Sequence, residues 1–285
     1  MQEDELILTP ALLEEYRRHL REQERSDATA EKYLYALNCL RGFLGGRPVT
    51  KPLMIEWKGE LSRTHAPATV NTMLAAANGL LRHFGRAECC LRFLKVQRQL
   101  FCSEERLLTR EEYTRLVDAA TARGDKRFAL LLQTMCATGV RVSEVRHITA
   151  EAVQTGRAVV NCKNKTRVIF LPGPLRKKLR AYLKEEGIRS GAIFRTRTGR
   201  SLDRFYIWRR MKTLCGAAGV SRQKVFPHNL RHLFARSFYA MERDIVRLAD
   251  LMGHSSINTT RIYTLDSGES HLRSMERLAG RLLTT

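Results

Sequence analysis

Residues 158–171 read Ala-Val-Val-Asn-Cys-Lys-Asn-Lys-Thr-Arg-Val-Ile-Phe-Leu. Two runs rich in β-branched and aromatic residues flank a polar turn at 163–165, which is the pattern of a β-hairpin. Pro172-Gly173-Pro174 ends the second run. No other stretch gives a comparable β signal, so we predict one small antiparallel sheet in a mainly helical chain.

Helical patterns surround this hairpin on both sides. Thr109-Arg-Glu-Glu112 has capping-box spacing and should open a helix. Apolar residues at helical spacing predict further helices at 126–136, 142–147, 175–186, 203–215, 229–241, 244–252 and 257–263. This part of the chain therefore reads as α+β.

The first hundred residues give helical signals alone. Thr9-Pro10 pairs a capping hydroxyl with a proline at the first helical position. Three more helices are predicted, from Ala30 to Gly45-Gly46, from Thr50 through Leu61, and from Val70 to Phe84. We predict a helical domain over 1–100, a linker over 101–107 and a second domain over 108–285.

Positive charge is concentrated in the second domain. The 285 residues carry 50 Lys and Arg against 29 Asp and Glu, a net charge of +21. Residues 1–100 hold 15 basic and 12 acidic side chains, whereas residues 101–285 hold 35 and 17. A field of this sign favours a polyanion, and nucleic acid is the first candidate.

Composition excludes several other classes. A hydrophobic fraction of 44% is that of a globular protein, and no apolar run approaches the ~20 residues of a membrane span. The acidic start, Met-Gln-Glu-Asp-Glu-Leu, does not resemble a secretory signal, which predicts a cytoplasmic protein. Seven cysteines without a C-x-x-C pattern predict reduced thiols and no zinc site.

Two arginines stand in contexts suited to a phosphodiester. Arg141 lies in Ala137-Thr-Gly-Val-Arg-Val-Ser-Glu144, and Arg231 lies in Pro227-His-Asn-Leu-Arg-His232. Two guanidinium groups can bind the non-bridging oxygens of one phosphate and neutralise a pentavalent transition state. His228 precedes Arg231 by three residues, so a helix presents both on one face.

These motifs, taken in order, resemble the tyrosine recombinases, the family of the phage integrases and the Xer proteins. The resemblance rests on Thr-Gly-x-Arg-x-x-Glu, the lysine hairpin, His-x-x-Arg-His, Gly253-His254, and Tyr263 nine residues later. The motifs span the second domain, and the first resembles the family's helical, SAM-like core-binding domain, which clamps DNA.

The resemblance implies a role for each motif residue. Tyr263 would attack the scissile phosphorus and form a 3′-phosphotyrosyl bond, so neither a metal nor another cofactor is needed. Arg141 and Arg231 would hold the phosphate, with Glu144 orienting Arg141. His228 would be the base or proton relay. His254 would donate a hydrogen bond to a non-bridging oxygen.

The acid that protonates the leaving 5′-oxygen would be a hairpin lysine. The family pattern is Gly-Lys-Gly-Asn-Lys-x-Arg with the first Lys catalytic, whereas this chain has Cys162-Lys-Asn-Lys-Thr-Arg167, one residue shorter. Aligning across that deletion makes Lys163 the acid, and Lys165 is the alternative.

Further basic residues are candidates for contacts with DNA. Such contacts to backbone phosphates supply affinity and a steep salt dependence, and those near 222–224 could reach base edges. The candidates are Arg176, Lys177, Lys178, Arg209, Arg210, Lys212, Arg222 and Lys224.

The resemblance also implies an assembly. Recombination needs a homotetramer on two DNA duplexes that carry a specific recombination site, and an accessory or directionality protein can take part. An amphipathic stripe in the tail would dock residues 268–285 on a neighbouring protomer, the alternative being packing on its own domain. The stripe comprises His271, Leu272, Met275, Leu278, Leu282 and Leu283.

The expected function is site-specific DNA recombination through a Holliday junction, as in integration, excision or resolution. Two alternatives share parts of this chemistry. A type IB topoisomerase-like enzyme would nick and close DNA with the same residue types. A DNA-binding regulator would keep the fold without catalysis, although every catalytic position is filled here.

Overall fold

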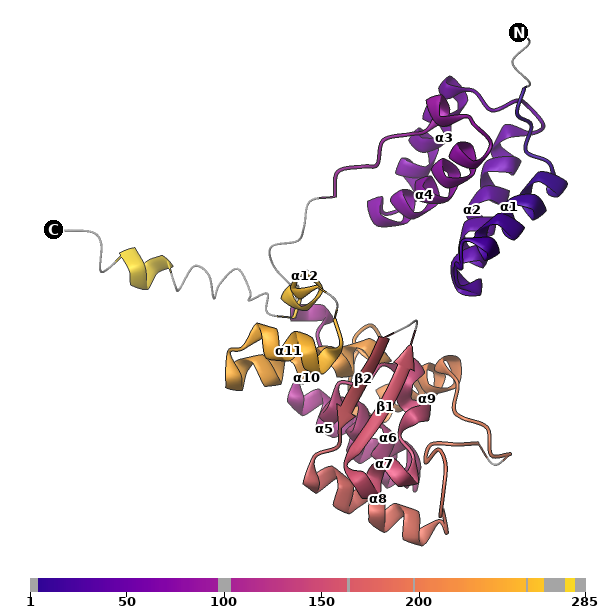
Figure 1. Ribbon diagram of the computed structural model, residues 1–285. Coiled ribbons are helices and arrows are strands. Elements are labelled where there is room, and N and C mark those ends of the chain that lie inside the picture. Colours follow the sequence, from indigo (N-terminus) through magenta and orange to yellow (C-terminus); the bar gives the residue numbers. More distant parts are fainter. Residues whose placement is uncertain are drawn as a thin grey trace. The chain divides into compact units, whose positions relative to one another are not determined.

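A computed structural model describes residues 5–96, 104–162, 165–196, 198–254, 256–263 and 275–279. The chain divides into two compact units, Met1–Arg98 and Gln99–Thr285. Helices dominate both units, as Figure 1 shows, and the mainly α fold class with one small sheet is confirmed.

The first unit is built from four α-helices and a short 3-10 helix. Thr9 and Thr50 cap two of the helices by accepting hydrogen bonds from Leu12 N and Leu53 N, and a proline follows at the start of each. The elements are α1 (Pro10–Glu22), α2 (Asp27–Leu44), α3 (Lys51–Thr64), α4 (Pro67–His83) and η1 (Ala87–Cys89).

The core of this unit is almost wholly apolar. Leucine, alanine and methionine side chains fill it, together with the buried Trp57 of α3. Asn78 of α4 is its buried polar residue. Its amide donates to Leu91 O and accepts from Leu91 N, both at 2.8 Å, and so fastens the segment after η1.

The second unit combines helices with the predicted hairpin. Thr109 and Glu112 form the expected capping box at the start of α5. The elements are η2 (Glu104–Arg106), α5 (Arg110–Ala122), α6 (Lys126–Thr138), η3 (Val142–His147), α7 (Ala150–Thr155), β1 (Arg157–Cys162), β2 (Lys165–Phe170), α8 (Gly173–Glu185), α9 (Arg204–Ala218), α10 (Pro227–Glu242), α11 (Ile245–Met252) and α12 (Ile257–Arg261).

Strands β1 and β2 pair antiparallel, with Arg157 opposite Phe170 and Cys162 opposite Lys165. Because side chains alternate along a strand, Val160 and Ile169 point into the core while Val159 is exposed. The hairpin is thus half buried.

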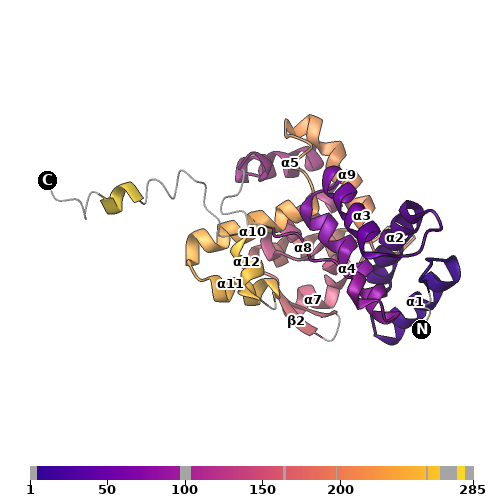
Figure 2. The same cartoon turned by 90° about the horizontal axis from the view of Figure 1, so that it is seen from above.

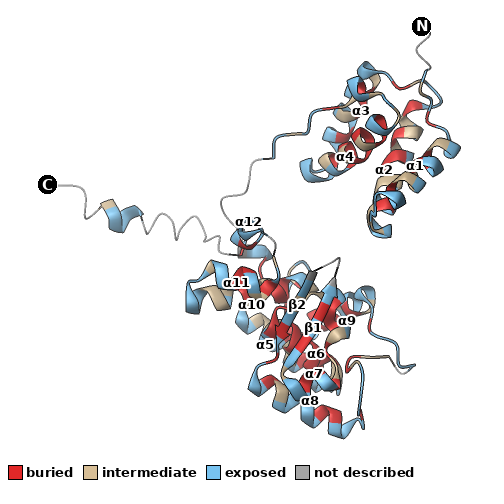
Figure 3. Ribbon diagram, viewed as in Figure 1, coloured by how far each residue is buried: buried red, intermediate tan, exposed pale blue. Residues whose placement is uncertain are grey.

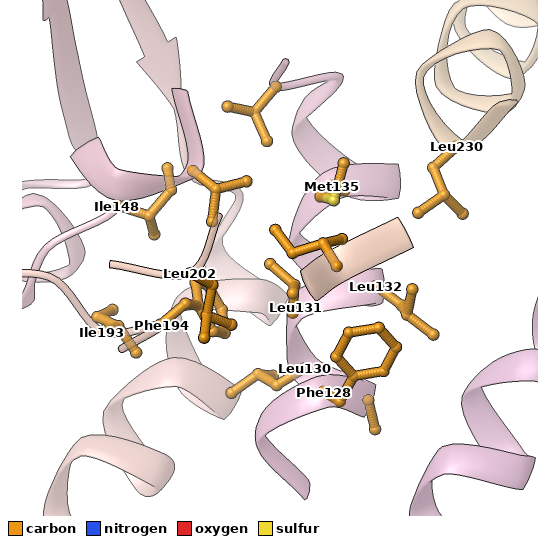
Figure 4. Close-up of a cluster of buried hydrophobic side chains, with 14 of the residues drawn as sticks. Phe128, Leu130, Leu131, Leu132, Met135, Ile148, Ile193, Phe194, Leu202 and Leu230 are labelled. Atoms are coloured by element: carbon orange, nitrogen blue, oxygen red, sulfur yellow. The ribbon is translucent and has the colours of Figure 1, made fainter. Parts of the chain in front are cut away.

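Helix α6 is the centre of the second core. Phe128, Leu131, Leu132 and Met135 pack there against residues from several other elements, among them Leu230 of α10 (Figure 4). Figure 3 shows that helices of both units have a buried face, turned toward the core of their unit, and an exposed face on the outside. Helices α10, α11 and α12 lie side by side in both views (Figures 1 and 2).

Three details differ from the sequence prediction. Residues 142–147 form a 3-10 helix, in which the Glu144 carboxylate accepts from the Arg141 backbone N–H. Helix α7 was not predicted, because only six residues separate its Thr149 cap from Gly156. In the predicted linker, residues 104–106 form η2, and Arg106 O accepts from Asn229 of α10.

Two other predictions fall largely outside the described residues. These are the hairpin turn, with Lys163, and most of the tail. Only residues 275–279 of the tail are described; they are helical, with Met275 and Leu278 exposed. No helix among the described residues is long and apolar enough to span a membrane.

Candidate active site

Arg141 sits where α6 ends and the chain turns into η3. Gly139 ends α6 in the left-handed conformation, with φ of 62°. The Arg141 Nη1 donates to Glu144 Oε1 at 2.8 Å, and its Nη2 donates to Gly253 O at 3.2 Å. With 39% of its side chain exposed, Arg141 still offers donors to a ligand.

Glu144 joins Arg141 to the hairpin. Its buried carboxylate also accepts from Arg167 Nη2 of β2 at 2.5 Å, and Arg167 Nη1 donates to Leu251 O of α11 at 2.9 Å. Burial raises the pKa of Glu144, but the hydrogen bonds from both arginines outweigh burial and leave it below its ordinary value. Glu144 is therefore ionised, and it fixes two guanidinium groups.

Arg231 is held more tightly than Arg141. It lies on the first turns of α10 and is only 2% exposed. Nη1 donates to Gly139 O at 2.5 Å, and Nη2 donates to Met252 O at 2.6 Å. Burial and the nearby Arg141 lower the pKa of Arg231 to about 10, which leaves it charged at neutral pH.

His254 follows the glycine that ends α11. Gly253 has φ of 61°, and a Cβ at this position would come within 2.4 Å of Arg167 Cδ, so glycine is required on both counts. The His254 Nε2 lies 2.9 Å from Arg231 Nη2, and its Nδ1 lies 2.8 Å from Thr260 Oγ1. Burial and the adjacent Arg231 lower the pKa of His254 to about 4.

Tyr263 comes two residues after α12 and is only 4% exposed. Three imidazole rings surround it. The His232 ring centroid is 4.4 Å away, edge to face; that of His254 is 5.8 Å away, nearly parallel; that of His228 is 6.2 Å away. Sequence reasoning left His232 outside the site, yet its ring is the nearest of the three to Tyr263.

The two histidines of α10 are both neutral at pH 7. Burial and the neighbouring His228 lower the pKa of His232 to about 4. His228 itself reaches solvent, but the surrounding protein and the guanidinium groups of Arg231 and Arg141 lower its pKa. A neutral His228 can accept a proton.

One cavity of about 920 Å³ is lined by five of the motif side chains. Arg141, His228, Arg231, His254 and Tyr263 all line it. They come from the start of η3, from α10, and from the ends of α11 and α12. The fold thus brings residues up to 122 positions apart in the sequence into one pocket.

Another part of the cavity wall is aromatic and was not predicted. Phe205 and Trp208 of α9 line it, and both are exposed, Trp208 by 44%. Arg204 lies over the Phe205 ring at 5.3 Å, and Lys212 Nζ lies 5.5 Å from the Trp208 ring. An i, i+3 pair of aromatics flanked by cations was the available signal in the sequence.

Two lysines near the hairpin turn are the candidates for the general acid. Lys163 lies outside the described residues. Lys165 is the first residue of β2, and the structure describes its backbone only. Lys165 belongs to the strand that carries Arg167.

The predicted DNA-contact residues divide into two groups. Lys177, Arg209 and Arg222 are exposed, as is Lys178 of the second group. The others bond within the protein: Arg176 to Val153 O and Gln154 O, Lys178 to Gln133, Arg210 to Asp125, Lys212 to Arg222 O and Lys224 to Glu112. Among the described residues, no three His, Cys, Asp or Glu side chains cluster as a metal site requires.

Comparison with known proteins gives a consistent picture. Residues 106–269 match the model of the phage integrase family. The chain is 27% identical to tyrosine recombinase XerA of Pyrococcus furiosus, over 96% of both proteins, and 34% identical to tyrosine recombinase XerD of Rhizobium meliloti, over 55% of this chain and 56% of that one.

Solved structures show the same fold. A lambda integrase fragment, residues 75–356, in a dimer bound to a COC′ core site, matches with a TM-score of 0.75 and 18% identity, over 92% of this chain and 97% of that one. XerH bound to its difH substrate matches with a TM-score of 0.68 and 19% identity, over 95% of this chain and 84% of that one. The family match spans more than half of the sequence, and the chain therefore belongs to the phage integrase family, as a Xer-like tyrosine recombinase.

Proposed function

We propose that this recombinase cleaves and rejoins duplex DNA at a specific site through a covalent bond between Tyr263 and a 3′-phosphate. Site-specific recombination is the reaction of a tyrosine recombinase; the proposal assigns its steps to residues of this chain. The observation that carries the assignment is the convergence of Arg141, His228, Arg231, His254 and Tyr263 on one cavity.

Cleavage begins with the phosphate bound between Arg141 and Arg231, whose remaining N–H groups bind its non-bridging oxygens. The Tyr263 oxygen forms a bond to phosphorus while the bond from phosphorus to the 5′-oxygen breaks. The phenol proton passes to the neutral His228. The two guanidinium groups neutralise the additional charge that develops on the phosphate.

The leaving 5′-oxygen takes a proton from Lys163, with Lys165 as the alternative acid. The covalent bond stores the energy of the phosphodiester. Attack by the 5′-hydroxyl of the partner strand reverses the steps and releases Tyr263, which gives strand exchange through a Holliday junction. The proposal includes no metal or other cofactor.

The assembly is a homotetramer on two duplexes. Structures of a lambda integrase tetramer on a Holliday junction and of XerH on difH support it. The first unit contributes to the DNA clamp, and residues 268–285 contact a neighbouring protomer. An accessory or directionality protein belongs to the same proposal.

Covalent capture tests the nucleophile and does not require the sequence of the target site. Wild type, Tyr263→Phe and the control Tyr239→Phe are expressed in cells carrying the native locus. Cells are denatured rapidly, and the DNA that remains attached to protein is sequenced. Tyr239 is the matched control because it packs in the same cluster as Tyr263 but does not line the large cavity.

The expected result is adducts at one discrete locus with wild type and Tyr239→Phe, and none with Tyr263→Phe. Adducts scattered over the genome would favour the topoisomerase-like alternative. Binding without any adduct would favour the regulator. Adducts retained by Tyr263→Phe would refute the assignment of the nucleophile.

The acid is identified by a substrate whose bridging 5′-oxygen is replaced by sulfur. A thiolate leaves without a proton, so loss of the acid should no longer matter. Lys163→Ala should slow cleavage of normal DNA more than Lys165→Ala does, and the sulfur substrate should restore it. If the sulfur substrate restores Lys165→Ala instead, Lys165 is the acid.

A further inference from the structure

The His254 imidazole is bonded on both sides in a way that determines its proton. Arg231 Nη2 lies 2.9 Å from His254 Nε2. An arginine side chain has donors only, so Nε2 must be the acceptor and carry no hydrogen. In the neutral ring the hydrogen is then on Nδ1, which donates to Thr260 Oγ1 at 2.8 Å.

This arrangement conflicts with the proposed work of His254. A hydrogen bond from Nε2 to a phosphate oxygen needs a hydrogen on Nε2, which the structure places on Nδ1. The ring must therefore change tautomer when the phosphate arrives. Whatever bonds to Nδ1 must accept a hydrogen before the change and donate one after it.

Thr260 meets that requirement. A hydroxyl both donates and accepts, and rotation about the C–O bond exchanges the two roles. We propose that Thr260 is a positioning residue that supports both tautomers of His254 and so permits the ring to switch from binding Arg231 to binding the scissile phosphate. The proposal rests on the function assigned above.

The protons balance across the switch. Arg231 Nη2 turns its N–H from His254 Nε2 to a phosphate oxygen. Nε2 first takes a proton from water, Nδ1 then gives its proton to water, and the Thr260 O–H donates to Nδ1. The ring is neutral before and after the switch, and there is no net gain or loss of protons.

The location of Thr260 gives the switch a second consequence. Thr260 is fully buried in α12, and its backbone carbonyl accepts from Tyr263 N at 2.9 Å. The residue that fixes the His254 ring is thus three positions from the nucleophile. Through this hydrogen bond, the hydroxyl held against Nδ1 belongs to the same residue that fixes the backbone of the nucleophile.

Nitrogen-15 spectra of histidine report the tautomer directly. His254 signals are identified by their loss in His254→Gln, and the DNA-bound state is prepared with Tyr263→Phe protein so that it does not react. We expect Nδ1–H in the free protein and Nε2–H on duplex DNA containing the site. Nε2–H in the free protein, or the same tautomer in both states, would overturn the proposal.

Variants of Thr260 supply the functional test. Thr260→Val removes the hydroxyl at nearly constant volume and should slow single-turnover cleavage by about 10- to 100-fold, by analogy with losing the partner that orients a metal-binding imidazole. Thr260→Ser should restore most of the rate. The control is Thr134→Val in α6, where a buried hydroxyl donates only to Leu130 O.

These results separate the two proposals. If Thr260→Val cleaves at the wild-type rate, the switch is wrong while Tyr263 remains the nucleophile. If Thr260→Ser fails together with Thr260→Val although both bind DNA, the hydroxyl is not the operative group. If wild type forms no adduct, the proposed function fails first, and the tautomer of the free protein still stands as measured.

Discussion

Among the described residues, buried charged side chains occur in the second unit and not in the first. The first unit has a core of apolar side chains with one buried amide, Asn78, whose partners are backbone atoms of a single loop residue. The second unit buries Glu144 and Arg231, and their hydrogen bonds join segments that are distant in the sequence. Burying a charge costs far more than burying an amide, so it marks a site retained for chemistry.

The largest effect should come from Arg231→Lys. An ammonium group cannot reproduce the planar fork that binds Gly139 O, Met252 O and the phosphate together. We expect cleavage to fall by about 10²- to 10³-fold, as when one donor to a transition-state oxyanion is lost, with folding retained. Single-turnover cleavage of a nicked site measures this.

Arg115→Lys is the matched control, because Arg115 also donates to backbone carbonyls, those of Ala218 and Gly219. It does not line the cavity. An equal loss of cleavage in Arg115→Lys would show that the effect comes from packing of the second unit. The claim that its buried charges serve catalysis would then be wrong.

Glu144→Gln should weaken both folding and catalysis. It leaves Arg141 and the half-buried Arg167 without their carboxylate, and breaking a buried ion pair costs about 3 kcal/mol. Urea unfolding followed by circular dichroism measures the stability. An unchanged free energy of unfolding would mean that the carboxylate serves only the site.

Asn78→Ala tests the other side of the comparison. Removing the amide leaves Leu91 N and O without partners and should destabilise the first unit by about 1 to 3 kcal/mol. Cleavage by the folded protein at saturating DNA should be unchanged. Asn71→Ala, which removes the same pair of bonds from the less buried Leu94, should cost less.

A smaller effect is expected from pH. The pKa values of His232 and His254 are about 4 in the folded protein, below the ~6.5 of an exposed imidazole. The unfolded chain binds more protons between these values, so stability falls as pH drops from about 6.5 toward 4. The dependence of the urea midpoint on pH should weaken in His232→Asn. A midpoint that rises on acidification would contradict the assigned directions.

Much of the fold was predictable because its signals are local. The hairpin, the capping box at Thr109 and the proline starts of α1 and α3 each depend on a few consecutive residues, and the structure has all of them. Helix α7 was missed because one and a half turns give no periodicity. The 3-10 form of residues 142–147 depends on a side-chain bond to the backbone that spacing alone does not reveal.

The site was predictable only where a motif had a known counterpart. Arg167 stood in the quoted hairpin motif without a role, and its bonds to Glu144 and Leu251 O exist only once α11 packs against β2. The nearness of His232 to Tyr263 and the aromatic wall on α9 also arise from tertiary packing. The roles of the motif residues remain predictions that the variants above test.

The chain has only two tryptophans, and each unit holds one. Trp57 is enclosed in the core of the first unit, whereas Trp208 stands at the cavity mouth of the second. Their fluorescence emission should differ accordingly. We expect a blue-shifted spectrum for the buried Trp57 and a red-shifted spectrum for the solvent-exposed Trp208. Trp208→Phe would leave Trp57 as the single fluorescent reporter of folding of the first unit. Trp57→Phe would leave Trp208 as the single reporter of DNA binding to the second.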